Sequence, residues 1–226
     1  MTRSSPLPEN TPAGIEVVYA DASLLVLNKP SGLLAVPGRG ADKQDCLSSR
    51  VQRLYPDALI VHRLDMATSG LMLMARGTGM QRALSGLFER REVHKRYLAV
   101  VDGHLKPASA PDGWGLIDLP ILVDWPRRPL RIIDAVLGKP SQTRWRALAF
   151  DAPTHSTRVE LEPLTGRSHQ LRVHLQALGH PILGDALYAP EGVQAKAPRL
   201  LLHACALGFM HPVSSEALLL ESRADF

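Results

Sequence analysis

The chain has 226 residues, of which 45% are hydrophobic and 21% are charged, and this ordinary balance excludes disordered and fibrous classes of protein. Its longest apolar runs fall far short of the roughly 20 residues that cross a bilayer, and its first residues lack the apolar core of a secretory signal. We therefore expect a cytoplasmic protein without a membrane anchor. The formal charge of +4 shifts the expected partners only slightly toward nucleic acid.

The first half of the chain predicts short strands separated by turn-rich loops. Residues 1–14 are polar and rich in proline, so we expect a mobile tail there. Apolar and β-branched residues predict strands at residues 15–20, 23–28, 60–64 and 71–75. A polar loop over residues 65–70 separates the last two of these strands. Helices are predicted at residues 47–54 and, with apolar residues on one face, at residues 80–91.

The second half adds more strands and one longer helix. We predict strands at residues 97–101, 144–150, 157–161, 200–208 and 217–221. The helix spans residues 167–178, with Leu171, Leu175 and Leu178 as its buried stripe and Gly179 as its end. Glycine and proline predict loops at residues 103–115 and 189–198.

Strands that arrive in pairs with few helices between them predict an α+β fold, in which flanking helices cover a largely antiparallel mixed sheet. We expect this fold to form a single domain over residues 15–226. Basic residues gather in the middle of the chain, and each group could be either a solvated face or an RNA contact: Arg90-Arg91, His94-Lys95-Arg96, Arg127-Arg128 with Arg131, and Arg144 with Arg146.

Two places carry charge in an unusual position. Arg63 and Asp65 stand two residues apart at the end of a predicted apolar strand, which would aim both side chains to the same side of the chain. The pair could also be a simple surface ion pair. Arg167 falls in the first turn of its predicted helix, where the helix dipole favours negative charge, so we expect an anion to face it.

The sequence offers no familiar catalytic framework and no cluster of metal ligands. His169 and His174 stand five residues apart on the predicted helix and therefore point to different faces. Cys46 and Cys205 lack metal-type spacing and are expected to be reduced thiols. We therefore predict that neither a metal nor another cofactor takes part.

Six runs that occur in a fixed order carry a resemblance to a known family: Asn28-Lys29-Pro30-Ser31-Gly32-Leu33, His62-Arg63-Leu64-Asp65-Met66-Ala67-Thr68-Ser69-Gly70, Lys95-Arg96-Tyr97, Gly166-Arg167-Ser168-His169-Gln170-Leu171-Arg172-Val173-His174, Gly179-His180-Pro181-Ile182-Leu183-Gly184-Asp185 and Leu201-Leu202-His203-Ala204. The chain resembles the RluA-type pseudouridine synthases from about Val17 onward. Three further motifs are most similar to the dual-specificity subfamily: Asp124-Trp125-Pro126, the Arg-Ser-His-Gln motif and the final Ala224-Asp225-Phe226.

The resemblance implies a role for five residues. Asp65 matches the catalytic aspartate, which acts at the ribose while uracil is detached through N1 and rejoined through C5. Arg63 matches the arginine that helps to displace the target base, and Tyr97 matches the tyrosine that stacks on it. Arg167 matches the arginine that pairs with the catalytic carboxylate, and Leu202 matches an apolar residue of the uracil pocket.

The resemblance also implies a pseudouridine synthase fold with a central cleft and an RNA substrate. No S4-type RNA-binding domain fits into the residues before the first strand, so the catalytic domain itself should bind RNA. The subfamily suggests a tRNA anticodon stem-loop, at the first nucleotide of the loop, and a similar loop in large-subunit ribosomal RNA. We expect a monomer without an obligate protein partner.

Three other readings stay open at this point. The chain could act on ribosomal RNA alone, or it could be a non-catalytic RNA-binding module with the same fold. A glycoside hydrolase is the third, although that chemistry normally needs two carboxylates beside the bond and no motif offers a second one. The sequence does not decide whether Asp65 adds covalently to ribose or acts as a base.

Overall fold

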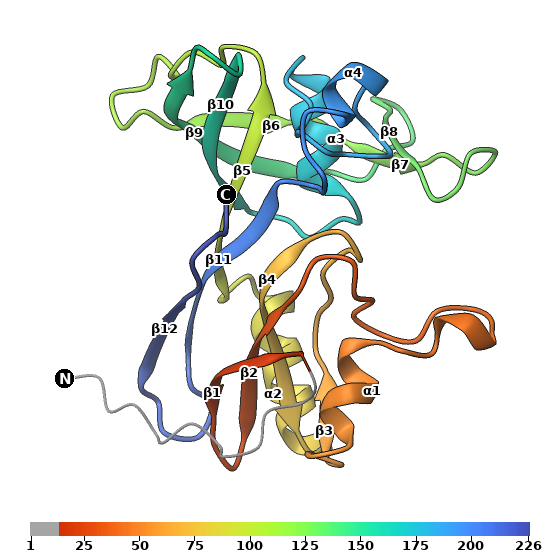
Figure 1. Ribbon diagram of the computed structural model, residues 1–226. Coiled ribbons are helices and arrows are strands. Elements are labelled where there is room, and N and C mark those ends of the chain that lie inside the picture. The colour runs from red at the N-terminus through yellow and green to blue at the C-terminus, as the bar shows by residue number, and fades with distance from the viewer. Residues whose placement is uncertain (1–13) are drawn as a thin grey trace. The chain divides into compact units, whose positions relative to one another are not determined.

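The computed structural model describes residues 14–226, and their contacts divide them into two compact units (Figure 1). The first unit contains the described residues up to Lys95 together with Ala204–Asp225, and the second contains Arg96–His203 together with Phe226. The predicted tail over residues 1–14 lies outside the described residues except for Gly14.

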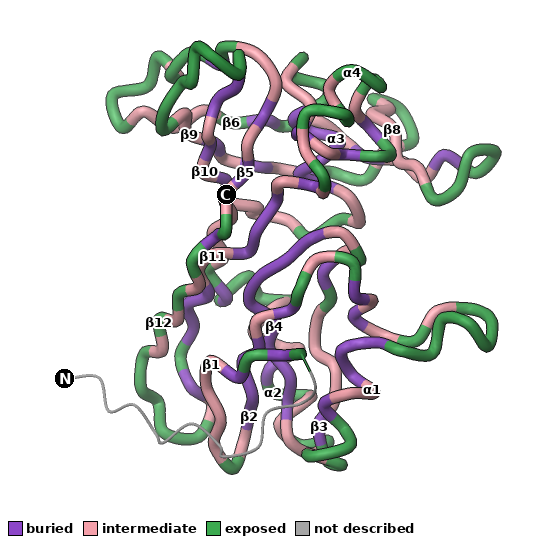
Figure 2. Tube along the Cα trace, in the orientation of Figure 1, coloured by how far each residue is buried: buried purple, intermediate pink, exposed green. Residues whose placement is uncertain are grey.

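The first unit is built on strands in the order β1-β2-β4-β11, with β3 beside β4 and β12 beside β11, and β1, β2, β3 and β4 pair in antiparallel fashion. The strands are β1 (Glu16–Ala20), β2 (Leu24–Lys29), β3 (Ala58–Ile60), β4 (Ser69–Arg76), β11 (Leu202–Met210) and β12 (Ala217–Glu221). In β4, every residue before Arg76 is buried, as the purple trace in Figure 2 shows. A strand that is covered on both faces reads as a continuous apolar run, which is what its sequence Leu71 to Ala75 displays.

The helix α2 (Thr78–Glu89) packs apolar side chains against this sheet. It places Leu84 at 0% exposure in a cluster with Leu71 and Leu73 of β4, and Phe88 packs against the same cluster. The short helix α1 (Leu47–Gln52) is capped by Cys46, whose Sγ accepts a hydrogen bond from the Ser49 amide. A single 3-10 turn, η1 (Ala41–Lys43), precedes it.

The second unit contains a sheet in the order β5-β10-β9-β6 and a separate two-stranded sheet, β7-β8. Its strands are β5 (His94–Asp102), β6 (Gly115–Asp118), β7 (Ile121–Val123), β8 (Arg131–Ile133), β9 (Gln142–Asp151) and β10 (Ser156–Pro163). The helices are α3 (Gln170–Ala177) and α4 (Glu191–Gln194). Ile121 of β7, Val173 of α3 and Tyr188 form a buried cluster that fixes the small sheet to α3.

Buried polar groups of α3 all find partners. The His174 ring pairs through Nδ1 with Thr143 Oγ1 at 2.9 Å and through Nε2 with the Leu119 carbonyl oxygen at 2.9 Å. The Arg172 guanidinium donates to both carboxylate oxygens of Asp185 at 2.8 and 2.6 Å, and both side chains are at most 4% exposed. Because buried polar groups are costly without partners, these bonds hold α3 in one position.

The predicted α+β class with a largely antiparallel sheet is confirmed, and so are most of the predicted strands. The strand predicted at residues 60–64 is wrong, because pairing with β4 stops at Ile60 and residues 61–64 form no ladder bonds. The helix predicted from residue 167 begins at Gln170, and Leu178 lies beyond its end with 37% exposure. The strands β6, β7 and β8 and the helix α4 were not predicted. No helix in the described part of the chain is long and apolar enough to cross a membrane.

Candidate active site

Asp65 lies in the loop that joins β3 to β4 in the first unit. Leu64 beside it is buried, Asp65 is half-buried and Arg63 is exposed. The Thr68 amide donates to the Asp65 carbonyl oxygen at 3.1 Å, which closes a turn directly after Asp65. Because residues 61–64 are not a strand, the alternation of a pleated strand does not set the directions of Arg63 and Asp65. The loop itself positions them.

A buried lysine, Lys29, forms a hydrogen bond to the backbone of this loop. Lys29 at the end of β2 is 0% exposed, and its Nζ donates to the carbonyl oxygens of Pro30, Leu33 and Met66 at 2.9, 2.8 and 3.0 Å. Met66 is the residue after Asp65, so the lysine ties the start of the loop to β2. Burial lowers the pKa of Lys29 to about 8, and the nearby Asp65 charge acts in the opposite direction and raises it.

Two further bonds join the same two segments. Ser31 Oγ donates to the Ala67 carbonyl oxygen at 2.7 Å, and the Gly32 amide donates to the Met66 carbonyl oxygen at 2.9 Å. The turn after β2 and the loop after Asp65 are therefore fixed to each other along their backbones. This arrangement reduces the freedom of the loop and so preorganises the carboxylate.

Gly70 fixes the far end of the loop. Its φ is +109°, and a Cβ built there would lie 2.3 Å from the Ala204 carbonyl oxygen and 2.5 Å from the Ala204 nitrogen. Both are backbone atoms of β11, so no side chain can make room. Only glycine allows β4 to approach β11 this closely.

His62, which precedes Asp65 by three residues, contacts both β4 and α2. Its Nε2 accepts a hydrogen bond from the Leu73 amide of β4 at 2.9 Å, and its ring stacks on Phe88 of α2 with centroids 4.6 Å apart. Burial, and to a lesser degree the Lys95 charge, lowers the pKa of His62 to about 3. The ring is therefore neutral at physiological pH and is not a proton donor there. It positions the segment that leads to Asp65.

Tyr97 and Leu202 lie in the second unit. Tyr97 is a half-buried residue of β5, opposite Leu161 in the register with β10. Leu202 is 3% exposed and begins β11. Both therefore sit on regular strands, whereas Asp65 sits on a loop.

Arg167 also lies in the second unit, but not in the helix that was predicted for it. The helix α3 begins after His169, whose φ of 59° and ψ of 13° place it in the left-handed region. Arg167 is exposed, its amide donates to Gln170 Oε1 at 3.0 Å, and its Nε donates to the Pro140 carbonyl oxygen at 3.4 Å. The argument that the helix dipole requires an anion opposite Arg167 is therefore wrong, because the residue precedes the first turn.

The structure places Arg63 and Asp65 in the first unit and Tyr97, Arg167 and Leu202 in the second. Lys29 and His62 have supporting positions that sequence reasoning missed. The signal that could have identified Lys29 was a lysine at the end of an otherwise apolar strand. A lysine is almost never fully buried unless it has partners, so this position predicts carbonyl or carboxylate groups around it. Across residues 14–226 no group of three or more acidic, histidine or cysteine side chains could hold a metal.

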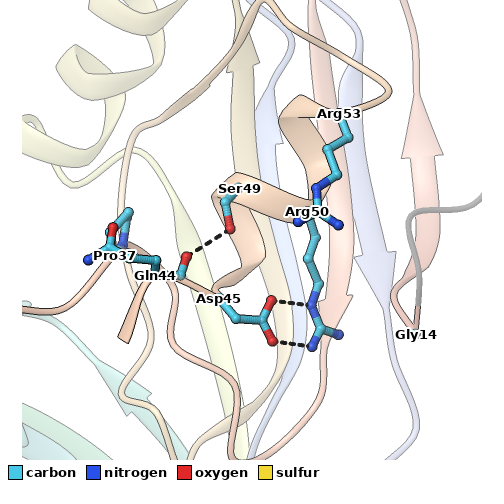
Figure 3. A pocket seen from close by; sticks show the side chains of 7 residues that line it. All are labelled: Gly14, Pro37, Gln44, Asp45, Ser49, Arg50 and Arg53. Carbon is cyan, nitrogen blue, oxygen red and sulfur yellow. Dashed lines mark hydrogen bonds and ion pairs between the residues drawn. The ribbon is translucent and has the colours of Figure 1, made fainter. Parts of the chain in front are cut away.

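A separate hollow lies beside α1 and contains none of the predicted site residues (Figure 3). Arg50 and Arg53 line it together with Gln44 and Ser49. Asp45 binds Arg50 through both carboxylate oxygens, at 2.7 and 2.6 Å, so one of the two positive charges is neutralised (Figure 3). The hollow therefore contains none of the residues that the resemblance assigns to the uridine site.

Comparison with known proteins identifies the family. A family model described as RNA pseudouridylate synthase matches residues 23–177. The chain belongs to this family. It is therefore an RNA pseudouridine synthase, an isomerase that converts uridine into pseudouridine within RNA.

Individual relatives of this RNA pseudouridylate synthase agree with that placement. The dual-specificity RNA pseudouridine synthase RluA of Escherichia coli (strain K12) is 48% identical over 210 residues, which are 93% of each chain. The protein of the same name from Yersinia pestis is also 48% identical, over 93% of this chain and 99% of its own. Among solved structures, human RNA pseudouridylate synthase domain containing 1 has a TM-score of 0.76 and 28% identity, covering 96% of this chain and 86% of that one.

Proposed function

We propose that this pseudouridine synthase has two classes of substrate, a tRNA anticodon stem-loop modified at the first nucleotide of the loop and a similar stem-loop of large-subunit ribosomal RNA. The observation that carries the proposal is its 48% identity, over 93% of the chain, to an enzyme named for dual specificity. A relative with one substrate is the alternative. Small loops suit an enzyme that must extract its target base, because unstacking costs less there than inside a duplex.

We assign the chemical step to Asp65, whose carboxylate acts at the ribose while uracil leaves through N1 and returns through C5. The loop that carries it is fixed by Lys29, Ser31 and Gly70 through the bonds and the close approach described above. A preorganised carboxylate of this kind can act as nucleophile or base without a metal or redox cofactor.

The four other residues receive supporting roles. Arg63 is exposed on the same loop and is suited to enter RNA in place of the displaced base. Tyr97 offers an aromatic ring for stacking, Leu202 contributes apolar surface to the uracil site, and Arg167 acts on turnover through its charge. We further propose that the enzyme works as a monomer in the cytoplasm without an obligate protein partner.

Replacement of Asp65 tests the catalytic assignment. Asp65→Asn keeps the shape of the side chain but loses the nucleophile or base, so isomerisation should fall by more than 1,000-fold while RNA binding survives, on the order of effects seen for catalytic nucleophiles. Asp42→Asn, an exposed aspartate of η1, serves as the matched control and should leave turnover unchanged. Residual activity of Asp65→Asn within tenfold of wild type would remove Asp65 from its role.

The substrate proposal is tested with isolated RNA fragments. Synthetic anticodon and ribosomal stem-loops should both be converted, the anticodon loop nearly as well as the full tRNA, and affinity should fall steeply as salt rises because phosphate contacts dominate. The product is an isomer of unchanged mass, so conversion must be read by a chemical or chromatographic assay that separates the two nucleosides. Conversion of only one of the two loops would establish the single-substrate alternative.

A further inference from the structure

The connection between β7 and β8 presents a tryptophan to solvent. Residues 125–129 are all exposed, as the green tube beyond β8 in Figure 2 shows, and Trp125 is 62% exposed. The guanidinium carbon of Arg128 lies 3.5 Å from the centre of a Trp125 ring. By contrast, Trp145 of the same unit is 8% exposed and serves the core. The indole of Trp125 is thus stacked with a cation but not packed into the protein.

Several hydrogen bonds hold the base of this connection. Asp124 is 6% exposed, accepts from the Arg127 amide at 3.2 Å and from Arg127 Nε at 2.7 Å, and its own amide donates to the Leu130 carbonyl oxygen at 3.1 Å. On the β8 side, the Arg131 amide donates to the buried Tyr188 hydroxyl at 3.0 Å. A platform that is already ordered loses little conformational freedom when a ligand binds to it.

The charge of the connection favours an anionic partner. Residues 124–131 contain three arginines and one aspartate, a net charge of +2. Arg127 is paired with Asp124 at 2.7 Å, but no described acidic side chain pairs with Arg128 or Arg131. Elsewhere in the unit, Arg144 and Arg146 are neutralised by Glu162 and Glu160. The β7–β8 connection therefore keeps a positive charge that acidic side chains do not neutralise.

We propose that Trp125 and Arg128 form a stacking site for an unpaired base of the substrate RNA, apart from the target uridine, with Arg128 and Arg131 contacting the flanking phosphates. The proposal rests on the function proposed above. An aromatic ring beside guanidinium groups that no acidic side chain neutralises is a combination by which proteins bind single-stranded RNA. A protein partner would also accept an exposed tryptophan, but two arginines without acidic neighbours favour a phosphate chain.

Binding measurements on hairpin variants test the site. The probe is a fluorescent stem-loop RNA that the wild-type enzyme converts, and binding is followed by anisotropy. Trp125→Ala should weaken binding about 5- to 100-fold, the range for loss of one base stack, whereas Trp125→Phe should stay within about threefold of wild type. Phe150→Ala is the matched control, since Phe150 is an exposed aromatic residue of the same unit that stacks on His104, and it should bind as wild type does.

The same RNA with single abasic positions identifies the base. At one loop position other than the target, removal of the base should weaken the wild type as much as Trp125→Ala does, and the two changes together should cost no more than either alone. Far-ultraviolet circular dichroism and the melting temperature establish that each variant is folded, and Arg128→Gln provides a second variant that should lose part of the same affinity.

Three outcomes would overturn the proposal. The first is folded Trp125→Ala that binds RNA within twofold of wild type. The second is a loss of RNA affinity in Trp125→Ala and Arg128→Gln that adds to the effect of every abasic position. This result would mean that no base stacks on Trp125. The third is unchanged RNA binding with loss of a protein complex. Conversion of the stem-loops by the wild-type enzyme is measured separately. A failure of the substrate proposal would therefore appear in the conversion assay and not in the binding measurements.

Discussion

Replacement of Lys29 by methionine removes the ammonium group that ties the Asp65 loop to β2 and keeps a side chain of similar length. Of its three carbonyl acceptors, Met66 keeps the Gly32 amide as a partner, so Pro30 and Leu33 lose theirs. Leu33 is buried, so its unpaired carbonyl group costs about 1–3 kcal/mol, whereas Pro30 is exposed and its carbonyl group can bind water instead. Against this, burial lowers the pKa of Lys29 from 10.5 to about 8, so removing the charge relieves about 3 kcal/mol.

The two effects nearly balance, so we expect Lys29→Met to change the free energy of unfolding at pH 7 by no more than about 2 kcal/mol. Turnover should fall on the order of 100-fold through displacement of Asp65, while RNA affinity changes little. Urea unfolding and single-turnover conversion measure the two effects. Lys43→Met, an exposed lysine of η1, is the control and should change neither.

The pH dependence gives a sharper test of the same lysine. The folded-state pKa of about 8 lies below the value of 10.5 for a free lysine, so between these values the folded protein binds fewer protons than the unfolded chain. The cost of burying the charge is fully present below pH 8 and is relieved as pH rises toward 10.5, which stabilises the wild type relative to Lys29→Met. Equal unfolding free energies of the two proteins at pH 7 and pH 10, with full turnover of the variant, would refute this reasoning.

Three further outcomes are expected. Gly70→Ala should lower the unfolding free energy, measured by urea unfolding, by clearly more than Gly77→Ala does, because a Cβ at Gly70 meets the Ala204 backbone at 2.3 Å. Gly77 has φ of 79° and ψ of 161° with open space around it, so its replacement should cost only the backbone strain, about 1–3 kcal/mol. Since the pKa of His62 is lowered to about 3, its stabilising contribution is present above pH 6.5 and is lost as pH falls toward 3. On acidification, His62→Gln should therefore lose less stability than the wild type does, by about 1.4 kcal/mol per pH unit. The exposed control His94→Gln should behave as the wild type does. Chelation by EDTA should leave conversion of a stem-loop unchanged, and recovery by one specific divalent ion with the RNA fold intact would contradict this.

The sequence predicted the strands well because their periodicity reflects burial. β9 and β10, for example, were predicted within two residues at each end, and their pairing follows from the short turn between them. The prediction of a strand at residues 60–64 was wrong because apolar content alone does not distinguish a paired strand from a loop whose Leu64 packs inward.

The start of α3 was misplaced for a different reason. Nothing in the local pattern shows that His169 adopts a left-handed conformation, which separates Arg167 from the helix. The supporting residues of the candidate site were also beyond the sequence. The three carbonyl groups around Lys29 Nζ come from residues 30, 33 and 66, so only folding brings the last of them to the lysine. The resemblance indicated Asp65, but not what holds it.

The discontinuity of the first unit has a consequence for synthesis on the ribosome. The second unit is formed by Arg96–His203 apart from Phe226, so nearly all of it is available to a nascent chain before β11 and β12 have emerged. The first unit cannot complete its sheet until β11 has been synthesised, because β4 borders β11 and Gly70 lies against Ala204. The sheet beside the loop that carries Asp65 is therefore completed only after β11 has been synthesised, and until then the proposed catalytic carboxylate lies next to an incomplete sheet.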